Sequence, residues 1–481
     1  MRLFVRADAW PALIAGSIAA ALLSAPLYVN DSPWLGAGVA LSVFVAWHAL
    51  RASSAVPWFP GLIAFGSCVQ WVLAPWMIYH YMDRPLVSAM AVESADYFSF
   101  AVPATVALVA GMYWPMAGGG WRRQVRGGRV PDAGAGAALP ASLRATCEAM
   151  VFGGLAARIL LSPFMPESLR FVAQLLGLLS WVGAFALLLI GAPGWKHRVL
   201  AVLGVVALSN LADLQFLDLL TWCVCLALTL AYRYKPRPRV VVPSAALLLS
   251  LLLAINAFKV GSRDDIRQMG LDANERAAVT GATIYSLVRD PARIFSPENL
   301  VLNANRLNEG YIIARVLAWV PSAEPYARGE TIVTALRSAL VPRFLDPDKY
   351  VVGGETIIPR FTGLRLINGT SMGLSVPGEL YANFGRTWAV AGTFLWGLLL
   401  GMIFRAFTRR ARSSVVWWAW TPYVFVAAFS AEQGVAEVLN TITKSGIVMW
   451  AVVSLAPAWS ELRRRARRPR PAPQPAPGAM T

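Results

Sequence analysis

Long apolar runs recur along most of this 481-residue chain and limit its fold more than any other feature. A helix needs about 20 consecutive apolar residues to cross the hydrocarbon core of a bilayer. The composition agrees, since 57% of the residues are hydrophobic and only 14% are charged, whereas roughly a quarter are charged in soluble domains. The sequence therefore predicts an all-α, polytopic integral membrane protein.

Apolar stretches of about 17–25 residues predict about twelve transmembrane helices. One long tract, from 197 to 232, is interrupted by Asn210, Asp213 and Asp218. Dividing it into two helices places every basic cluster on the same side of the membrane. The twelve predicted ranges are 10–29, 34–50, 58–79, 97–116, 145–162, 169–192, 197–211, 215–232, 240–260, 383–404, 414–431 and 442–459.

Basic clusters alternate with the apolar runs, for example at 122–129 and 405–412, while the turns between them carry acids such as Glu93, Glu432 and Glu437. Cytoplasmic loops of bacterial membrane proteins are enriched in Lys and Arg. The net charge of +17 is thus explained by topology, and we expect no nucleic-acid partner. Both termini are predicted to be cytoplasmic.

These features divide the chain into four parts. Residues 1–260 form a membrane domain of about nine helices with a basic cytoplasmic linker at 118–144, and 261–382 form one large extracytoplasmic (periplasmic) loop. Residues 383–459 form three C-terminal transmembrane helices, and 460–481 form a basic, Pro/Ala-rich cytoplasmic tail.

The large loop holds twelve arginines but one lysine, balanced by thirteen acidic residues. Arginine binds phosphate or carboxylate through two parallel hydrogen bonds, so this ratio favours anion recognition over general surface charge. Ion pairing inside a folded loop is the alternative for any single arginine.

At the end of the loop, the sequence Ser375-Val-Pro377-Gly378-Glu379 has the chemistry of a helix start. A hydroxyl precedes the first turn and proline lies inside it. A helix beginning there would direct free N–H groups toward the outer face, a ready site for an anion. Glu379 would lie beside that site.

Two charged residues, Glu148 and Arg158, fall within one predicted transmembrane helix. Ten residues of helical rotation place them on different faces, so we do not expect them to pair. Arg158 either lines the same cavity as the loop or extends to the lipid headgroups. The three histidines are scattered, and Asp346-Pro-Asp348 is typical of a turn, so neither a metal ion nor a cofactor is expected.

Several short motifs together resemble the bacterial oligosaccharide repeat-unit polymerases, the Wzy-like O-antigen and capsule polymerases. The resemblance covers mainly residues 337–407, within a polytopic frame with one large outer loop. The motifs are Val-Pro342-Arg343, Asp348-Lys349, Gly354-Glu355 and Glu379-x-Tyr381-x-Asn383-Phe384-Gly385, followed by a glycine-rich apolar run.

This resemblance implies a glycosyltransferase whose donor is an undecaprenyl-pyrophosphate-linked oligosaccharide. It also implies that a flippase and a chain-length regulator are partners. We expect Glu379 to be the general base, with Glu355 as its competitor, and Arg343 to neutralise the pyrophosphate. The substrate-binding candidates are Arg337, Arg360, Arg365, Tyr381, Asn383 and Arg158.

Two other functions remain open at this stage. An O-antigen ligase would share the architecture and donor but use lipid A core as acceptor. A flippase or other transporter would distribute charged residues along its spans and contain related halves, whereas this chain concentrates them in one loop.

Overall fold

The computed structural model describes residues 9–25, 32–52, 56–81, 89–117, 141–161, 164–165, 167–213, 216–236, 295–341, 355–366, 372–411 and 414–456, with a few isolated residues between 239 and 292. Every regular element in these ranges is helical, so the all-α prediction is confirmed for them. Several predicted features lie outside them, namely Arg343, Asp346 and Asp348, most of the range 240–260, the linker up to residue 140 and the tail 460–481.

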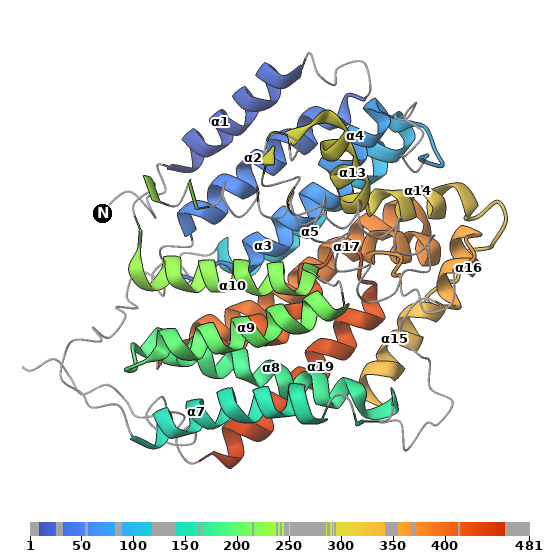
Figure 1. Ribbon diagram of the computed structural model, residues 1–481. Helices are drawn as coiled ribbons and strands as arrows, with labels where there is room; N and C mark the ends of the chain where they lie inside the picture. The colour runs from blue at the N-terminus through green and yellow to red at the C-terminus, as the bar shows by residue number, and fades with distance from the viewer. Residues whose placement is uncertain are drawn as a thin grey trace, which may run out of the picture.

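Among the N-terminal helices, α1 packs against α2, and α8 packs against both α7 and α9, whereas α5 packs mainly against the distant α17. Figure 1 shows α7, α8, α9 and α10 along one side of the molecule and α1 and α2 along the other. The helices are α1 (Ala9–Ser24), α2 (Trp34–Ala52), α3 (Phe59–Cys68), α4 (Ala74–His80), α5 (Ser94–Ala117), α7 (Ala141–Ala156), α8 (Glu167–Ile190), α9 (Trp195–Asp213) and α10 (Phe216–Tyr234), with π-helical turns η2 (Val69–Leu73) and η3 (Ala157–Leu161). The predicted division of 197–232 into two helices is confirmed by the separate α9 and α10.

The segment predicted as the large loop contributes short helices, and the C-terminal part contributes two long ones. The short helices are α13 (Pro297–Leu307), α14 (Gly310–Trp319), α15 (Glu330–Leu340) and α16 (Ile357–Thr362). They are followed by α17 (Val376–Ala411), η5 (Val415–Ala419), α18 (Trp420–Phe425), η6 (Val426–Phe429) and α19 (Val435–Leu455).

Five helices are long and apolar enough to cross a membrane: Phe59–His80, Ser94–Ala117, Phe171–Ile190, Val376–Ala411 and Val435–Leu455. Eleven of the twelve predicted ranges overlap a described helix, and 240–260 is the exception. Six of these eleven contain no described helix as long and apolar as the five candidate spans. The described residues therefore fit a membrane protein with five candidate spans, and the number twelve is not confirmed.

The predicted span at 414–431 is not one regular helix. It is divided into the 3₁₀ turns η5 and η6 with the short α18 between them. Pro422 lies in the first turn of α18, where its missing N–H costs nothing, but it cannot continue a helix from the preceding residues. The predicted span at 414–431 is therefore not confirmed, and the helical stretch Val415–Phe429 is shorter than the candidate spans.

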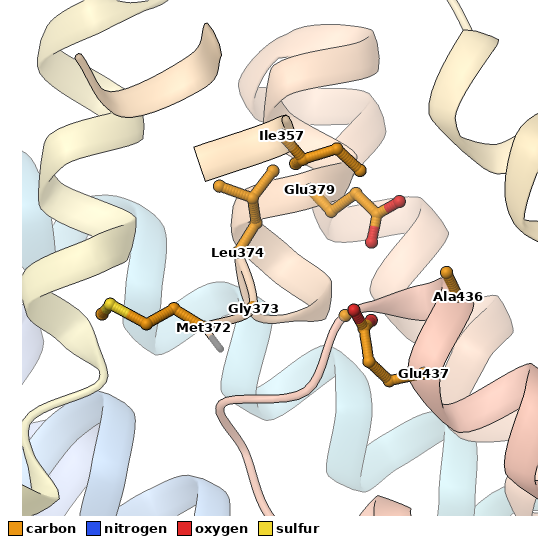
Figure 2. A pocket seen from close by; sticks show the side chains of 8 residues that line it. Ile357, Met372, Gly373, Leu374, Glu379, Ala436 and Glu437 are labelled. Carbon is orange, nitrogen blue, oxygen red and sulfur yellow. The ribbon is translucent and has the colours of Figure 1, made fainter. Parts of the chain in front are cut away.

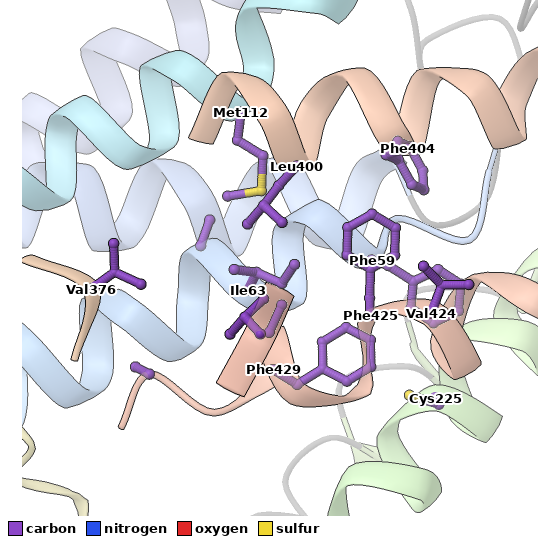
Figure 3. Packing of buried hydrophobic residues seen from close by; sticks show 14 of the residues in the cluster. Phe59, Ile63, Met112, Cys225, Val376, Leu400, Phe404, Val424, Phe425 and Phe429 are labelled. Carbon is purple, nitrogen blue, oxygen red and sulfur yellow. The ribbon is translucent and has the colours of Figure 1, made fainter. Parts of the chain in front are cut away.

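Buried side chains join α3, α5, α17 and α18 into one core. Figure 3 shows Ile63, Met112, Leu400, Phe404 and Phe425 converging from these four helices. A side-chain hydrogen bond joins α5 to the turn before α4. Pro75 has no N–H to donate to the carbonyl of Trp71 four residues earlier. The hydroxyl of Tyr97 on α5 donates to that carbonyl instead, at 2.8 Å.

The helices α5 and α17 approach each other backbone to backbone. A Cβ built on Gly397 would overlap the carbonyl oxygen of Leu108, and one on Gly401 would overlap that of Met112. Gly397 and Gly401 therefore allow α5 to pack closely against α17.

The long helix α17 is broken near its start at Gly385. This residue has φ 74° and ψ −178°, a conformation that only glycine adopts readily. An unbroken helix would separate Leu380 from Gly392 by about 18 Å, yet a Cβ on Gly392 would lie 3.1 Å from the Leu380 side chain. Residues 376–384 are therefore turned back toward the rest of α17.

Candidate active site around Glu379

The carboxylate of Glu379 is buried where α15, α17 and α19 meet. Glu379 lies on the first turn of α17 and is only 3% exposed. One oxygen, Oε1, accepts a 2.8 Å hydrogen bond from the hydroxyl of Thr331 on α15, and Oε2 accepts a 2.7 Å bond from the backbone N–H of Val435. Three segments far apart in the sequence thus converge on one carboxylate.

Asn383, one turn after Glu379, fixes α15 to α17. Its Nδ2 donates to the Thr331 hydroxyl oxygen at 2.7 Å and to the backbone carbonyl of Glu379 at 2.8 Å. Its Oδ1 accepts from the backbone N–H of Gly329 at 2.9 Å. Asn383 was predicted to bind substrate, and the structure shows it holding the partner of Glu379 in place.

Two carboxylates lie beside the N-terminus of α19, Glu437 of α19 itself and Glu379 of α17. Glu437, the third residue of α19, accepts a hydrogen bond from the backbone of Gly434, as the third residue of a helix does in a capping box. A Cβ built on Gly434 would lie 2.8 Å from Oε2 of Glu379 and 2.8 Å from Oε2 of Glu437. These two oxygens are therefore no farther apart than twice that distance, beside the positive end of the helix dipole.

A small cavity borders both carboxylates. Its volume is about 10 Å³, close to the space that one water molecule needs. Figure 2 shows Glu379 and Glu437 at this cavity, coming from α17 and α19. In this conformation it admits a water-sized group and excludes a sugar ring. The lining residues are Ile357, Met372, Gly373, Leu374, Glu379, Gly434, Ala436 and Glu437.

The predicted helix start is confirmed, because α17 begins at Val376. The predicted exposure of its N–H groups is wrong, since residues 373–383 are all buried. The chain before α17 packs against the turn before α19, where the Ser375 N–H donates to the Glu432 carbonyl at 3.1 Å. The Ser375 hydroxyl, buried and without a hydrogen-bond partner among the described residues, does not cap the helix.

Two further carboxylates, both partly buried, lie outside the candidate spans, Glu309 just before α14 and Glu432 just before α19. Burial, followed by the charge of Glu432, raises the pKa of Glu309 to about 8. Burial, followed by the charge of Glu437, also raises the pKa of Glu432. Glu309 is therefore mostly protonated at neutral pH.

Arg360, a predicted pyrophosphate ligand, is paired with two carboxylates of the chain itself. Its Nε lies 2.6 Å from Glu324 Oε1, and its terminal nitrogens lie 2.8 and 3.0 Å from the two oxygens of Glu330. The hydrogen bonds from Arg360 hold the pKa of Glu330 below its usual value. An incoming anion would have to compete with these partners.

The remaining predicted residues do not join Glu379 in one cluster. Arg337, Arg365 and Glu355 are exposed, whereas Glu379 is buried, and Arg343 lies outside the described residues. Tyr381 is buried, with its hydroxyl 3.4 Å from the carbonyl oxygen of Val320.

Arg158 lies in η3, with its NH2 group 3.8 Å from Asp218 of α10. It is not among the residues that line the Glu379 cavity. Glu148 is bound instead by Arg144 at 3.1 Å and Arg198 at 3.2 Å. The prediction that Glu148 and Arg158 do not pair with each other is confirmed.

Sequence reasoning missed Thr331, Glu437, Glu432 and Glu309 as neighbours of the site. The sequence analysis used Glu432 and Glu437 only as acidic residues that mark a turn on the outer side, and did not predict that they lie near Glu379. Thr331 carries no local signal, because its role arises from a contact with residue 379, far along the chain.

Within the described ranges, no group of three or more His, Cys, Asp or Glu side chains is arranged to hold a metal ion. Comparison with known proteins gives no matching family model, no matching curated protein and no matching solved structure. The function is therefore argued from the residues and their geometry.

Proposed function

We propose that the chain is a membrane glycosyltransferase that polymerises lipid-linked oligosaccharide repeat units on the outer face of the bacterial inner membrane. One observation carries the proposal: Glu379 is a buried carboxylate with two fixed donors at the edge of a small cavity. It also belongs to the Glu379-x-Tyr381-x-Asn383 motif on which the family resemblance rests.

In the proposed reaction, Glu379 removes the proton from a hydroxyl group of the acceptor repeat unit. That oxygen attacks the anomeric carbon of the donor glycan, and the bond from this carbon to undecaprenyl pyrophosphate breaks, with the electron pair leaving on the pyrophosphate. Thr331 and the Val435 N–H orient the carboxylate. Each carboxylate oxygen has a second lone pair for the substrate.

The pyrophosphate charge needs cations at the leaving group. Arg343, Arg337 and Arg365 are the proposed ligands, and Arg360 would join them only by exchanging its pairs with Glu324 and Glu330. Glu379 is favoured over Glu355 as the base because its carboxylate is buried and oriented, whereas Glu355 is exposed.

The test replaces Glu379 with Gln, which has nearly the same shape but cannot act as a base, in a strain that lacks the native gene. E379Q should reach wild-type membrane levels while its glycan remains as single repeats on lipid A core. General base catalysis contributes about 10²–10⁴-fold. E355Q is the matched control and should keep long chains. Long chains in E379Q at equal protein level would remove Glu379 from the mechanism.

Deletion of the whole chain distinguishes the neighbouring activities. Single-repeat glycan on lipid A core supports the polymerase. Free polymer would instead indicate an O-antigen ligase, and repeat units retained in the inner leaflet would indicate a flippase.

The proposed topology has both termini in the cytoplasm and residues 261–382 in the periplasm. Alkaline phosphatase is active only in the periplasm, so a fusion at Gly310 should be active. An inactive fusion would contradict this orientation.

A further inference from the structure

Three of the four large apolar side chains of α15 lie on its exposed face, whereas Ile332 packs against the core. Val333, Leu336 and Leu340 are 66%, 45% and 68% exposed. At 3.6 residues per turn they fall within an arc of about 60° around the helix. An amphipathic helix of a soluble domain directs such a stripe into the core, so this one needs another apolar partner.

The opposite face of α15 is small and polar, and it packs on the rest of the protein. Thr331 donates to Glu379, Ala335 is fully buried, and the Ser338 hydroxyl accepts from Asn440 of α19 at 3.0 Å. The helix is therefore held in its present rotation by hydrogen bonds. Its aliphatic stripe faces away from the protein.

The position of α15 points to the membrane as the partner of that stripe. It packs against α17 and α19, both candidate spans. Hydrogen bonds place it lengthwise along α19, because Thr331 lies near the start of that helix and Ser338 binds Asn440 further along it. Figure 1 shows α15 and α19 running in a similar direction, so the exposed stripe of α15 lies beside a candidate span.

The apolar surface also continues from α15 onto α17. The ring of Phe384, 41% exposed, lies 3.5 Å from the place of a Cβ on Gly329, at the start of α15. Trp388, beyond the break at Gly385, is 71% exposed, and tryptophan is enriched where a span enters the headgroup layer.

We propose that α15 is a lipid-facing helix, with Val333, Leu336 and Leu340 against the acyl chains of membrane lipids. The occupant of the stripe is bilayer lipid, not a second protein. Because Thr331 lies on the same helix, α15 has lipid on its exposed face and a hydrogen bond to Glu379 on its buried face. This inference does not depend on the reaction proposed above.

The experiment places a nitroxide label on single introduced cysteines in the full chain, reconstituted into phosphatidylethanolamine–phosphatidylglycerol vesicles. The background carries C223S, because Cys68, Cys147 and Cys225 are buried and Cys223 is partly exposed. L336C and L340C report on the stripe, and A323C, at an exposed turn before α15, is the aqueous reference. Power saturation then compares access by oxygen, which concentrates in lipid, with access by a water-soluble nickel chelate.

We expect the ratio of oxygen to nickel access to be several-fold higher at 336 and 340 than at 323. A ratio equal to that at 323 would place the stripe in water and overturn the proposal. Protection from both reagents would show a covering protein segment or a second copy, and would overturn it as well. Two labelled positions keep the test decisive if one variant does not fold.

Discussion

Two adjacent residues of α15, Glu330 and Thr331, belong to polar clusters of opposite character. Thr331 faces inward and donates to the buried Glu379, whereas Glu330 is exposed and pairs with Arg360. Exposed ion pairs contribute about 0–1 kcal/mol to stability because water competes for them. A buried acceptor or donor that loses its partner costs more, about 1–3 kcal/mol.

Arg360 and Glu379 lie in different clusters, although the sequence predicted them in one site. Arg360 is bound by carboxylates near solvent, whereas Glu379 is bound by neutral donors in the interior. The first turn of α15 is the only chain segment of the described structure that these bonds place in both clusters. We therefore expect changes in the buried cluster to dominate stability.

The largest effect should come from E379A. This change leaves the Thr331 hydroxyl and the Val435 N–H without an acceptor in a buried site, at about 1–3 kcal/mol for each donor. Thermal unfolding in detergent, followed by intrinsic fluorescence, should show a clear fall in the transition temperature. The exposed control E355A should change it little, and equal effects of the two variants would break the comparison.

Next comes a pH effect at Glu309. Its raised pKa means that the folded chain binds a proton that the unfolded chain releases between about pH 4.5 and 8. The free energy of unfolding should therefore fall as pH rises through this window and stay low above it, by the order of a few kcal/mol. E309Q should remove most of this fall and be more stable than wild type at pH 9. A wild-type transition independent of pH from 5 to 9 would show that Glu309 is not in a dry environment.

A smaller loss is expected for T331V, which keeps the side-chain shape. The variant loses the donor to Glu379 and the acceptor of Asn383, and we expect it to lower the free energy of unfolding by about 1–3 kcal/mol. T334V, the same change on the same helix, is the matched control, because Thr334 makes none of these bonds. Thermal unfolding of the two purified variants measures the difference in their transition temperatures. Equal temperatures would show that the Thr331 hydrogen bonds do not stabilise the buried cluster.

The smallest effect is expected for R360A. Loss of its pairs with Glu324 and Glu330 should lower the free energy of unfolding by about 1 kcal/mol or less. The difference from wild type should shrink further in 1 M salt, where exposed charges are screened within about 3 Å. An R360A effect as large as that of E379A would contradict the energetic division between the clusters.

Local chemistry could be predicted from the sequence, whereas long-range contacts could not. The start of α17 follows from Pro377, a signal that acts over a few residues. The separation of α9 from α10 follows from the acidic interruption at Asp213 together with the distribution of basic clusters along the chain. The contact of Glu379 with Thr331 and Val435 joins residues 48 and 56 positions away. Likewise, the arginine count of the loop could not show that Glu324 and Glu330 occupy Arg360.

The glycine contacts between α5 and α17 have a mechanical consequence. Where the carbonyl oxygens of Leu108 and Met112 occupy the places of missing side chains at Gly397 and Gly401, the two helices leave no gap as wide as an acyl chain. They cannot slide past each other without their backbones colliding, and Arg386 ties the far end of the pair to Asp96. We therefore expect movement that widens the cavity beside Glu379 to involve the elements around this pair, including residues 376–384 beyond the break at Gly385.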